Sequence, residues 1–450
     1  MPLQLYNTRT RSVEPFVPLR DGAVRVYVCG LTPSAQAHIG HARSFLFFDV
    51  LRRYLTHCGY KVTYVQNVTD IDDRSIERAR ETGERWYDIV SGYYAGFKES
   101  MRRLGVREPD VEPYATAFIE PILATIAKLV EAGYAYPTSQ GVYYRVSAFP
   151  RYGALANRNV AELRSGARVE VDQGKRDPLD FALWKFAKPG EPSWPSPWGD
   201  GRPGWHIECS AMARALLDPP GEGFDIHGGG ADLIFPHHEN EIAQSEPLMN
   251  RPPMANVWMH GGLLLYENKK MSKSLGNFEP LGELLDRHDS QAIRVLFLQT
   301  GYRKVMNFTE ESVTAAAVVL EKLKKTYREL RESAPAAPGA TPLMARIEGA
   351  LDDDMNTAVA LAALLDAGSS TATLSEYVAA LDVLGLTPDE SWRGAASADL
   401  PAELAAMLEL RDRARADKNW VESDRLRDEL LARGIELKDS KEGTTWTVVG

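Results

Sequence analysis

The pattern of apolar and polar positions divides the chain into a first part that predicts strands alternating with helices and a last part that predicts helices. Apolar, β-branched runs at residues 24–28 and 61–68 predict short buried strands, and apolar residues at helical spacing from 44 to 55 predict a helix between them. After residue 301 the helical spacing dominates, and residues 434–449 predict two short strands. We therefore expect an α/β fold, with a Rossmann-like parallel-sheet domain followed by α-helical domains and a small mixed C-terminal tail.

Composition places further boundaries along the chain. Residues 133–204 are strand-like and punctuated by Pro and Gly, which predicts a small β-rich subdomain inserted into the sheet domain. Residues 333–342 and 387–399 are loose connections. The expected units are residues 1–132 and 205–300 for the two halves of the sheet domain, 133–204 for the insertion, 301–342 for a helical region with its linker, 343–399 for a helical bundle and 400–450 for the tail domain.

Charge and composition exclude several classes of protein. The 450 residues carry a formal net charge of −10, which argues against a general nucleic-acid binder, so any nucleic-acid contact needs a locally basic surface. No apolar run reaches the length of about 18 residues that predicts a transmembrane helix, and we expect no membrane partner. The three cysteines are too few for a disulfide framework, which favours a cytoplasmic location. A monomer is expected because no exposed apolar stripe stands out.

The first chemical motif follows the first of these predicted strands. Residues 29–43 contain a Gly/Pro turn and then His38-Ile-Gly40-His41 at a predicted helix start, a context that holds phosphate groups. Gly40 lets the backbone approach a ligand, and two imidazoles three residues apart can donate hydrogen bonds to a phosphoryl group during transfer. By itself this short pattern is weak, because histidines at a helix start also cap or pack.

A second motif lies far along the chain, at Lys270-Met-Ser-Lys273-Ser. Two lysines around small hydroxyl residues, shortly before Gly276, make a cationic loop that suits a triphosphate. Alone, the motif would more often be a solvated basic turn. Both motifs, in this order in one chain, resemble the paired signatures of class I aminoacyl-tRNA synthetases.

Glycines and acidic residues mark two further strand ends. His227 precedes three glycines at 228–230, and bare glycine backbone accepts a flat group such as an adenine; the alternative is a plain flexible turn. Residues 69–73, Thr-Asp-Ile-Asp-Asp, follow the strand expected at 61–68. For this acidic cluster, helix capping and substrate contact are equally weighted hypotheses.

Four candidate metal ligands are spread over the chain: Cys29, Cys209, His237 and Glu241. Each lies at or near a predicted strand end or helix start around the same expected cleft, and two thiolates with an imidazole and a carboxylate suit zinc best. No Cys-x-x-Cys spacing supports the site, and each residue has an ordinary alternative as a core, capping or solvated residue.

Further stretches carry a resemblance to bacterial cysteinyl-tRNA synthetases over nearly the whole chain. Besides the two signature motifs they are Asn67-Val-Thr-Asp-Ile-Asp-Asp73, Gly204-Trp-His-Ile-Glu-Cys209, Asp225-Ile-His-Gly-Gly-Gly230, Phe235-Pro-His-His-Glu-Asn-Glu241, Asp352-Asp-Asp-Met-Asn-Thr357 and Glu442-Gly-Thr-Thr-Trp446. The resemblance implies an ATP-dependent, AMP-forming ligase that activates L-cysteine as its adenylate and transfers it to the 3′ end of tRNA-Cys. The helical domains after residue 301 would then bind the tRNA.

The resemblance also implies roles for individual residues. A zinc ion held by Cys29, Cys209, His237 and Glu241 would bind the thiolate of the cysteine substrate, and ATP would enter with magnesium. The catalytic residues would be His38 and His41, which stabilise the reacting phosphorus, and Lys270 and Lys273, which hold the pyrophosphate. The expected ATP-binding residues are Gly40, His227, Gly228, Gly229, Gly230 and Lys273. The expected residues of the amino-acid pocket are Gly30, Thr69 and Trp205.

One segment departs from the family pattern and keeps alternatives open. Residues 31–35 read Leu-Thr-Pro-Ser-Ala where the family usually carries Pro-Thr-Val-Tyr-Asp, which leaves a substrate contact from that tyrosine in question. A related ligase joins cysteine to an amino-sugar inositol in mycothiol synthesis, and it shares the zinc and both motifs but lacks the anticodon-recognising tail. This chain has the tail, through Trp446, which favours the synthetase. A non-catalytic tRNA-binding paralogue is the remaining alternative, and the intact signature residues argue against it.

Overall fold

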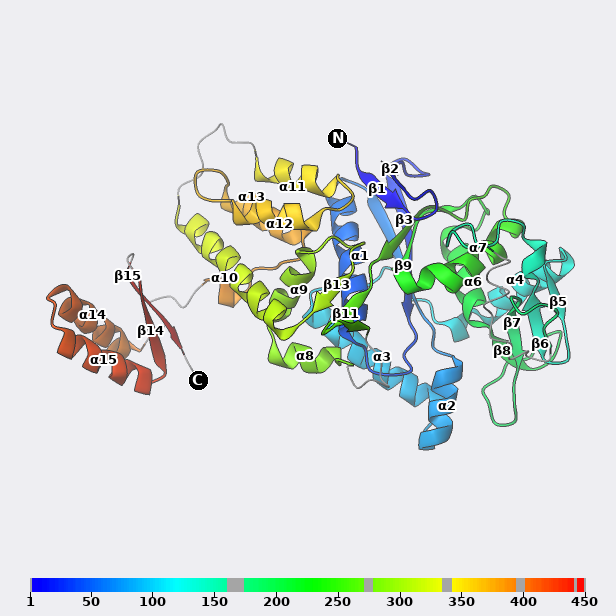
Figure 1. Ribbon diagram of the computed structural model, residues 1–450, viewed down its shortest axis with the longest axis horizontal. Coiled ribbons are helices and arrows are strands. Elements are labelled where there is room, and N and C mark those ends of the chain that lie inside the picture. Colours follow the sequence, from blue (N-terminus) through cyan, green and yellow to red (C-terminus); the bar gives the residue numbers. More distant parts are fainter. Residues whose placement is uncertain are drawn as a thin grey trace. The chain divides into compact units, whose positions relative to one another are not determined.

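The computed structural model describes residues 2–159, 174–270, 278–333, 342–393, 401–440 and 443–448 (Figure 1). The chain forms two compact units. The first comprises residues 1–323 and 335–387, and the second comprises residues 324–334 and 388–450. Among the described residues, none of the helices combines the length and the apolar character that crossing a membrane requires.

A four-stranded parallel sheet forms the centre of the first unit. Its strands are β3 (Ala23–Leu31), β4 (Lys61–Val68), β9 (Phe224–Gly230) and β10 (Ala255–Gly261), in the order β10-β9-β3-β4. β3 and β9 are buried along most of their length, as strands of a parallel sheet covered on both faces are. From β3 the chain continues to β4 at one edge of the sheet, whereas from β9 it continues to β10 at the opposite edge. The direction of strand addition therefore reverses between β3 and β9. Their carboxyl ends therefore frame the crevice in which ligands bind in such sheets.

Helices cover the two faces of this sheet (Figure 1). The helix α1 (Ile39–His57) packs on one face, where the ring of Phe48 lies so close to Gly228 that a Cβ there would be 2.4 Å from it. α6 (Trp205–Leu217) and α7 (Glu239–Ser245) lie on the other face, where Tyr27 and Cys29 share a core with Ile207 and Cys209. The alternation of side chains along β3 thus aims Cys29 at α6 and α7.

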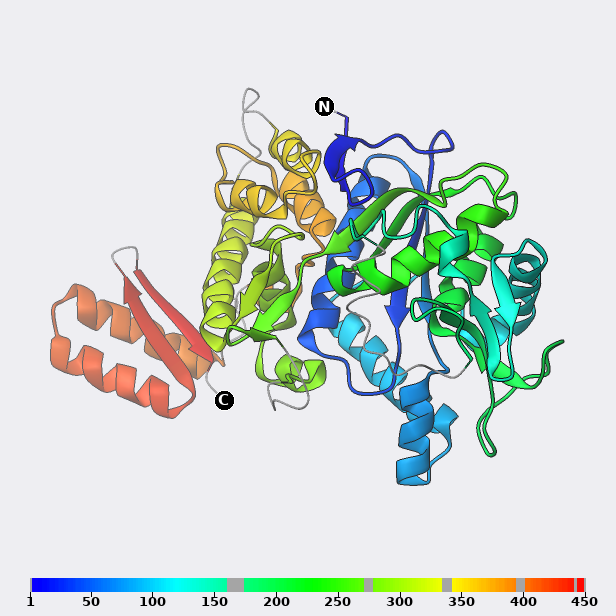
Figure 2. The same cartoon turned by 45° about the vertical axis from the view of Figure 1, so that its right-hand side comes forward.

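Among the described residues, the segment between β4 and α6 contains several helices and a second sheet. The helices are α2 (Asp73–Thr82), α3 (Trp86–Arg103) and α4 (Ile119–Glu131). Strands β5 (Ala135–Pro137), β6 (Gly141–Tyr144), β7 (Phe181–Phe186) and β8 (Gly201–Pro203) form an antiparallel sheet in chain order, which is easiest to see in Figure 2. This is the β-rich content expected between residues 133 and 204, whereas the exact limits of the insertion remain a prediction.

Short strands and helices complete the first unit. The hairpin β1 (Gln4–Asn7) and β2 (Ser12–Pro15) opens the chain, and β11 (Leu264–Tyr266) lies between β12 (Lys269–Lys270) and β13 (Met306–Phe308). The helices are α8 (Leu281–Arg287), α9 (Ser290–Leu298), α11 (Leu343–Leu351), α12 (Thr357–Leu365) and α13 (Leu374–Val383), together with α10 (Glu310–Glu332), whose last residues belong to the second unit.

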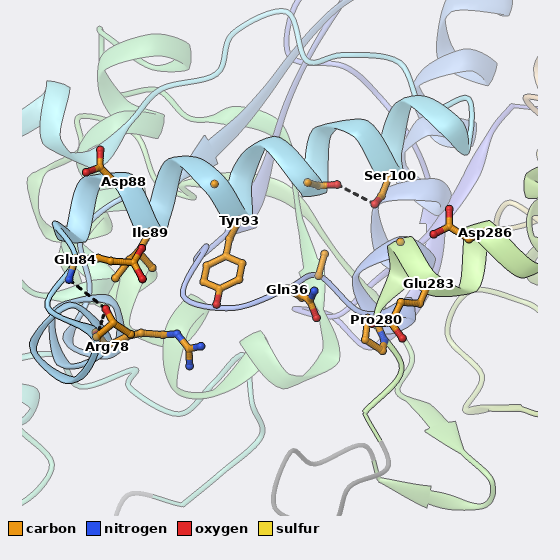
Figure 3. Close-up of a pocket in the computed structure, with 15 residues that line it drawn as sticks. Gln36, Arg78, Glu84, Asp88, Ile89, Tyr93, Ser100, Pro280, Glu283 and Asp286 are labelled. Carbon is orange, nitrogen blue, oxygen red and sulfur yellow. Dashed lines mark hydrogen bonds between the residues drawn. The ribbon is translucent and has the colours of Figure 1, made fainter.

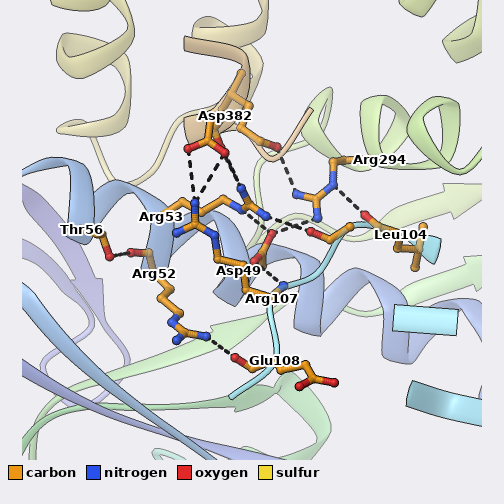
Figure 4. Close-up of polar contacts among 11 residues, drawn as sticks. Asp49, Arg52, Arg53, Thr56, Leu104, Arg107, Glu108, Arg294 and Asp382 are labelled. Carbon is orange, nitrogen blue, oxygen red and sulfur yellow. Dashed lines mark hydrogen bonds and ion pairs between the residues drawn. The ribbon is translucent and has the colours of Figure 1, made fainter. Parts of the chain in front are cut away.

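A buried network of ionic contacts joins α1, α9 and α13 (Figure 4). The Asp49 carboxylate accepts bonds from Arg294 and from Arg53, each at 2.9 Å, and from the backbone N–H of Arg107. Arg53 also donates to the carboxylate of Asp382, at 2.9 Å. Arg294 and Asp49 are almost fully buried, whereas the Asp382 side chain is 60% exposed.

The second unit has its own small core. Helices α14 (Ala402–Ala416) and α15 (Trp420–Ala432) pack with the hairpin β14 (Ile435–Ser440) and β15 (Gly443–Val448). The buried residues of this core are Met407, Leu426, Leu430, Ile435 and Leu437. The two strands expected near the end of the chain are therefore present.

Candidate active site

Two histidines at the start of α1 face the crevice between β3 and β9. His38 is the helix N-cap, and its Nδ1 accepts the backbone N–H of Gly40 at 3.1 Å, while Nδ1 of His41 accepts the backbone N–H of His38 at 3.1 Å. The rings stack with their centroids 3.8 Å apart. Burial, together with the neighbouring His38, lowers the pKa of His41 well below its ordinary value, so its imidazole is neutral. Because both Nδ1 atoms accept, the neutral rings carry their protons on Nε2 and present two N–H donors.

A cleft of about 440 Å³ opens beside these histidines. It is bordered by the carboxyl ends of β3, β9 and β10 and by the chain that follows β10. The predicted site residues that line it are Cys29, Gly30, His38, Gly40, His41, Trp205, Gly229 and Gly230. Segment 261–265 forms the wall of the cleft beyond β10. Residues predicted from separate parts of the sequence thus meet around one cavity.

Gly30 is required by the close approach of β4. A Cβ on Gly30 would lie 1.6 Å from the backbone oxygen of Asn67, and the backbone N–H of Gly30 donates to the side chain of Asn67 at 2.9 Å. The side-chain oxygen of Asn67, Oδ1, which accepts that bond, also lies 3.6 Å from the sulfur of Cys209. Asn67 therefore connects the wall of the cleft with the thiol behind it.

Cys29, Cys209, His237 and Glu241 form a buried cluster next to the cleft. Their ligand atoms all lie within 4.8 Å of one another. The two sulfurs are 3.8 Å apart, Cys29 Sγ lies 3.5 Å from Glu241 Oε1, and that oxygen lies 3.2 Å from His237 Nε2. The fold explains this convergence, because Cys29 lies near the carboxyl end of β3 and Cys209 lies in α6. His237 lies in the helical turn just before α7, and Glu241, four residues later, lies in the first turn of α7.

Two members of this cluster, Cys209 and Glu241, have a pKa that favours the anionic form of a metal ligand. Burial raises the pKa of the Cys29 thiol, and the hydrogen bond from that thiol lowers the pKa of Cys209 to about 6. Burial opposes ionisation of Glu241, but the neighbouring His227 and His237 lower the pKa of its carboxyl to about 2. A thiolate and a carboxylate thus face one another across a space that suits a cation.

A second group of four ligand atoms overlaps the first and comprises Cys29, His227, His238 and Glu241. His227 Nε2 lies 2.9 Å from Glu241 Oε2, and His238 Nε2 lies 3.3 Å from Cys29 Sγ. His227 is fully buried and stacks on Trp258 with the ring centroids 4.4 Å apart. It faces the carboxylate rather than the cleft, so its expected contact with ATP remains a prediction that this placement does not favour.

Other predicted residues lie away from the cleft or outside the described ranges. Thr69 is buried and accepts a hydrogen bond from Asn67 at 3.3 Å, and Gly228 makes room for Phe48. The backbone of Lys270 belongs to β12, whereas Lys273 lies outside the described residues. In the acidic stretch, Asp72 caps α2 by accepting the N–H groups of two residues in its first turn, so the capping hypothesis holds for that residue.

Sequence reasoning missed three residues that shape the site. Asn67 and His238 fall inside motif stretches, but no pattern in one sequence tells which way their side chains point. Arg43 follows His41 by two residues, and its buried guanidinium donates to the carbonyls of Gly262 and Leu263 at 3.1 and 2.8 Å. The position of Arg43 within the first motif was the one feature of the sequence that could have indicated a role in the site.

A larger cavity, of about 530 Å³, lies between α3 and α8 and contains none of the predicted site residues (Figure 3). Its lining includes Arg78, Tyr93 and the acidic side chains of Glu84, Glu283 and Asp286. Volume alone therefore does not select the candidate site, whereas the first signature motif and two of the three glycines at 228–230 line the smaller cleft.

Comparisons with known proteins agree with this geometry. Residues 15–318 match the family of tRNA synthetases class I (C) catalytic domain, and residues 397–446 match the family of cysteinyl-tRNA ligase anticodon binding domain. The chain is 48% identical to a cysteine–tRNA ligase of Stutzerimonas stutzeri, with 99% of both chains covered, and 47% identical to one of Azotobacter vinelandii, with both covered completely.

Solved structures of similar fold are more distant in sequence. A Mycobacterium tuberculosis methionyl-tRNA synthetase in complex with methionyl-adenylate matches 80% of this chain and 89% of its own, with a TM-score of 0.58 and 14% identity. A LeuRS of Agrobacterium radiobacter K84, solved in a ternary complex with tRNA, matches 82% of this chain and 84% of its own, with a TM-score of 0.59 and 11% identity. These two likenesses concern the fold alone, and they agree with the α/β class predicted from the sequence.

Proposed function

Because this chain belongs to the cysteine–tRNA ligase family of class I aminoacyl-tRNA synthetases, we propose that its buried Cys29–Cys209–His237–Glu241 cluster holds a zinc ion that selects cysteine. The enzyme is an ATP-dependent ligase that joins cysteine to tRNA. The observation that carries the zinc proposal is the position of this cluster, since one of its members, Cys29, also lines the cleft.

The donor set fits zinc in chemistry and in spacing. Zinc bonds of about 2.0–2.3 Å in a tetrahedron separate neighbouring ligand atoms by about 3.3–3.8 Å. The distances of 3.8, 3.5 and 3.2 Å within the cluster are close to that range. The second oxygen of Glu241 is held by His227, and the Nδ1 of His237 lies 2.8 Å from Nδ1 of His206. Such outer contacts orient metal ligands, so we propose an orienting role for His227.

A bound zinc ion would supply a soft Lewis-acid site that favours the thiolate of cysteine over the hydroxyl of serine. The protein's part is to hold the amino acid so that its carboxylate reaches the α-phosphate of ATP. Trp205 and Gly30 line the cleft next to Cys29 and would form the walls of that pocket. Loss of a strong metal–sulfur bond discriminates by about 10⁴ or more, so no second, hydrolytic site is needed.

His38 and His41 would act on the phosphate. Both rings present Nε2–H donors at the helix start, next to Gly40, whose backbone leaves room for a phosphate. The donors would bind the charge that develops on phosphorus while cysteinyl-adenylate and pyrophosphate form. Lys270 and Lys273 would hold the pyrophosphate, and Gly229 and Gly230 would lie against ATP, which enters with magnesium. These roles remain proposals, as do a cytoplasmic location and a monomeric state.

The second unit would recognise the tRNA. It holds all of the residues that match the anticodon binding domain, which argues against the alternative ligase that lacks such a domain. The adenylate formed in the first unit would pass its cysteinyl group to the terminal ribose of tRNA-Cys, and AMP would leave. The domain limits expected from the sequence, residues 301–342, 343–399 and 400–450, are proposed here as the tRNA-binding regions.

One experiment tests the zinc proposal and the alternatives together. Cysteinylation of a tRNA-Cys transcript and cysteine-dependent exchange of labelled pyrophosphate into ATP are measured before and after removal of metal with a chelator, and again after zinc is returned. We expect both activities to fall on chelation and to return with zinc. Full activity without metal would contradict the zinc proposal, and product on an amino-sugar inositol but none on tRNA would contradict tRNA as the acceptor.

A further inference from the structure

The motif Asp352-Asp-Asp-Met-Asn-Thr357 lies between α11 and α12, away from the chemistry proposed above, yet its backbone is unusual. Asp354 and Met355 both adopt the left-handed conformation, with φ of +51° and +54°, and Met355 is fully buried. Left-handed backbone is uncommon for residues other than glycine, and it persists where surrounding contacts hold it. Two such residues in succession therefore indicate that contacts from other parts of the chain hold the backbone of this segment in one conformation.

The Asp354 carboxylate holds that shape through four donors. One oxygen accepts the backbone N–H of Tyr6 at 2.8 Å and the hydroxyl of Tyr302 at 2.9 Å. The other accepts two bonds from the guanidinium of Arg303, at 2.9 and 2.6 Å. The guanidinium also lies over the ring of Tyr6, 4.1 Å from its centroid. Only 12% of the Asp354 side chain is exposed, so water competes less for these bonds than for those of an ion pair on the open surface.

Two of the three residues that bond to Asp354, Tyr302 and Arg303, belong to a loop that supports the cleft wall. The carbonyl of Tyr302 accepts the backbone N–H of Gly262 at 2.7 Å, and the carbonyl of Leu263 accepts the backbone N–H of Met306 at 3.0 Å. A Cβ on Gly262 would lie 2.6 Å from the Arg303 carbonyl oxygen, so the loop and the wall are in direct contact. Segment 261–265 is the side of the cleft beyond β10.

The same loop is fixed to the catalytic helix. Arg43, two residues after His41, donates to the carbonyls of Gly262, Leu263 and Lys304, and so binds the wall and the loop together. The ring of Tyr302 stacks on Phe47 of α1, with centroids 4.0 Å apart and planes within 7°. The wall segment therefore has two supports, Arg43 from within the site and the Tyr302–Lys304 loop from behind.

We propose that Asp354 is a positioning residue for the ATP side of the cleft, acting through Tyr302 and Arg303 on segment 261–265. This inference rests on the proposed assignment of that cleft to ATP. The wall segment follows β10, whereas the thiols of the metal cluster lie on β3 and α6, so a displaced wall disturbs ATP more than cysteine. A chain of packed contacts of this kind transmits changes of about 3-fold to 30-fold in an affinity or rate.

Steady-state kinetics of the zinc-loaded full-length enzyme test the proposal. The KM values for ATP and for cysteine are measured in the pyrophosphate exchange reaction for wild type, Asp354→Asn and Tyr302→Phe. Asparagine tolerates the left-handed backbone, so the first variant removes the charge and leaves the local conformation. Phenylalanine keeps the stack on Phe47 and loses only the hydroxyl. Asp366→Asn is the matched control, because Asp366 pairs with Arg346 at an exposed site in the same unit.

We expect Asp354→Asn to raise the KM for ATP about 3-fold to 30-fold, with the KM for cysteine within about 2-fold of wild type, and Tyr302→Phe to act in the same direction but less. The control should change neither constant. An unchanged KM for ATP in Asp354→Asn, or equal increases in both constants, would overturn the proposal. If Asp354→Asn fails to fold, the KM values of Tyr302→Phe for ATP and for cysteine are judged by the same criterion. An inactive wild-type enzyme would instead contradict the proposed function.

Discussion

Removal of the Asp49 charge is expected to destabilise the first unit far more than removal of the Asp382 charge. Both carboxylates accept a bond of 2.9 Å from Arg53, so the two substitutions Asp49→Asn and Asp382→Asn are chemically alike. They differ in burial, since Asp49 also faces the fully buried Arg294 whereas the Asp382 side chain is 60% exposed. The pair of variants therefore isolates the effect of burial on one kind of contact.

The expected magnitudes follow from what each substitution leaves behind. Asp49→Asn leaves the Arg294 guanidinium buried without its anion, and such a loss costs about 3–5 kcal/mol. Asp382→Asn removes a partner that water replaces, which costs about 0–1 kcal/mol. Urea unfolding of both variants and of wild type measures the difference in unfolding free energy, provided that the slope of free energy against urea concentration is the same for all three proteins. A midpoint for Asp49→Asn no lower than that of Asp382→Asn would refute the reasoning.

The same network predicts a dependence on pH. Burial alone would raise the pKa of Asp49, but Arg294 and Arg53 hold it below its ordinary value. A depressed pKa contributes stability that is complete above the unfolded value of about 3.9 and is lost as the pH falls through the folded value. The stability difference between wild type and Asp49→Asn should therefore be constant near neutral pH and narrow below about pH 4. A difference that widens in acid would contradict this assignment.

Three further predictions concern the active site directly. Cys209→Ser should lower both the zinc content and the affinity for cysteine, measured by metal analysis and by the KM in pyrophosphate exchange; unchanged metal stoichiometry would remove Cys209 from the cluster. His41→Asn should lower the exchange rate by about 10²–10³, as loss of a donor to developing charge does, and a rate within about 3-fold of wild type would argue against that role. Gly30→Ala places a Cβ 1.6 Å from the Asn67 oxygen, so it should unfold at lower urea than wild type, and an equal midpoint would show that β4 can shift.

Local patterns in the sequence predicted the elements and much of the site. The strands at 24–28 and 61–68, the helix after residue 38 and the final hairpin are set by apolar spacing and turn residues, and the structure contains them. The predicted metal ligands converge because each lies near the end of a strand or the start of a helix, and these ends meet at the crevice of a parallel sheet. These inferences needed no knowledge of distant contacts.

The rest depended on contacts between distant parts of the chain. The triple glycine predicted an adenine surface, but Gly228 accommodates Phe48 and only Gly229 and Gly230 reach the cleft. His227 looked like an ATP ligand because it precedes those glycines, yet strand alternation turns it toward Glu241. Asp354 lies 52 residues from Tyr302, so no local pattern could reveal that its carboxylate supports the cleft wall.

The separation of the candidate metal ligands along the chain has a consequence for synthesis of the protein. Cys29 leaves the ribosome long before Cys209, which follows it by 180 residues, and the histidine and carboxylate emerge later still. The two thiols of the cluster therefore emerge one well after the other, and closing so long a loop is slow compared with forming local helices. If the cluster binds zinc as proposed, all four ligands are available only after residue 241 has emerged, when β3, β4, α6 and β9 are already synthesised and β10 is not.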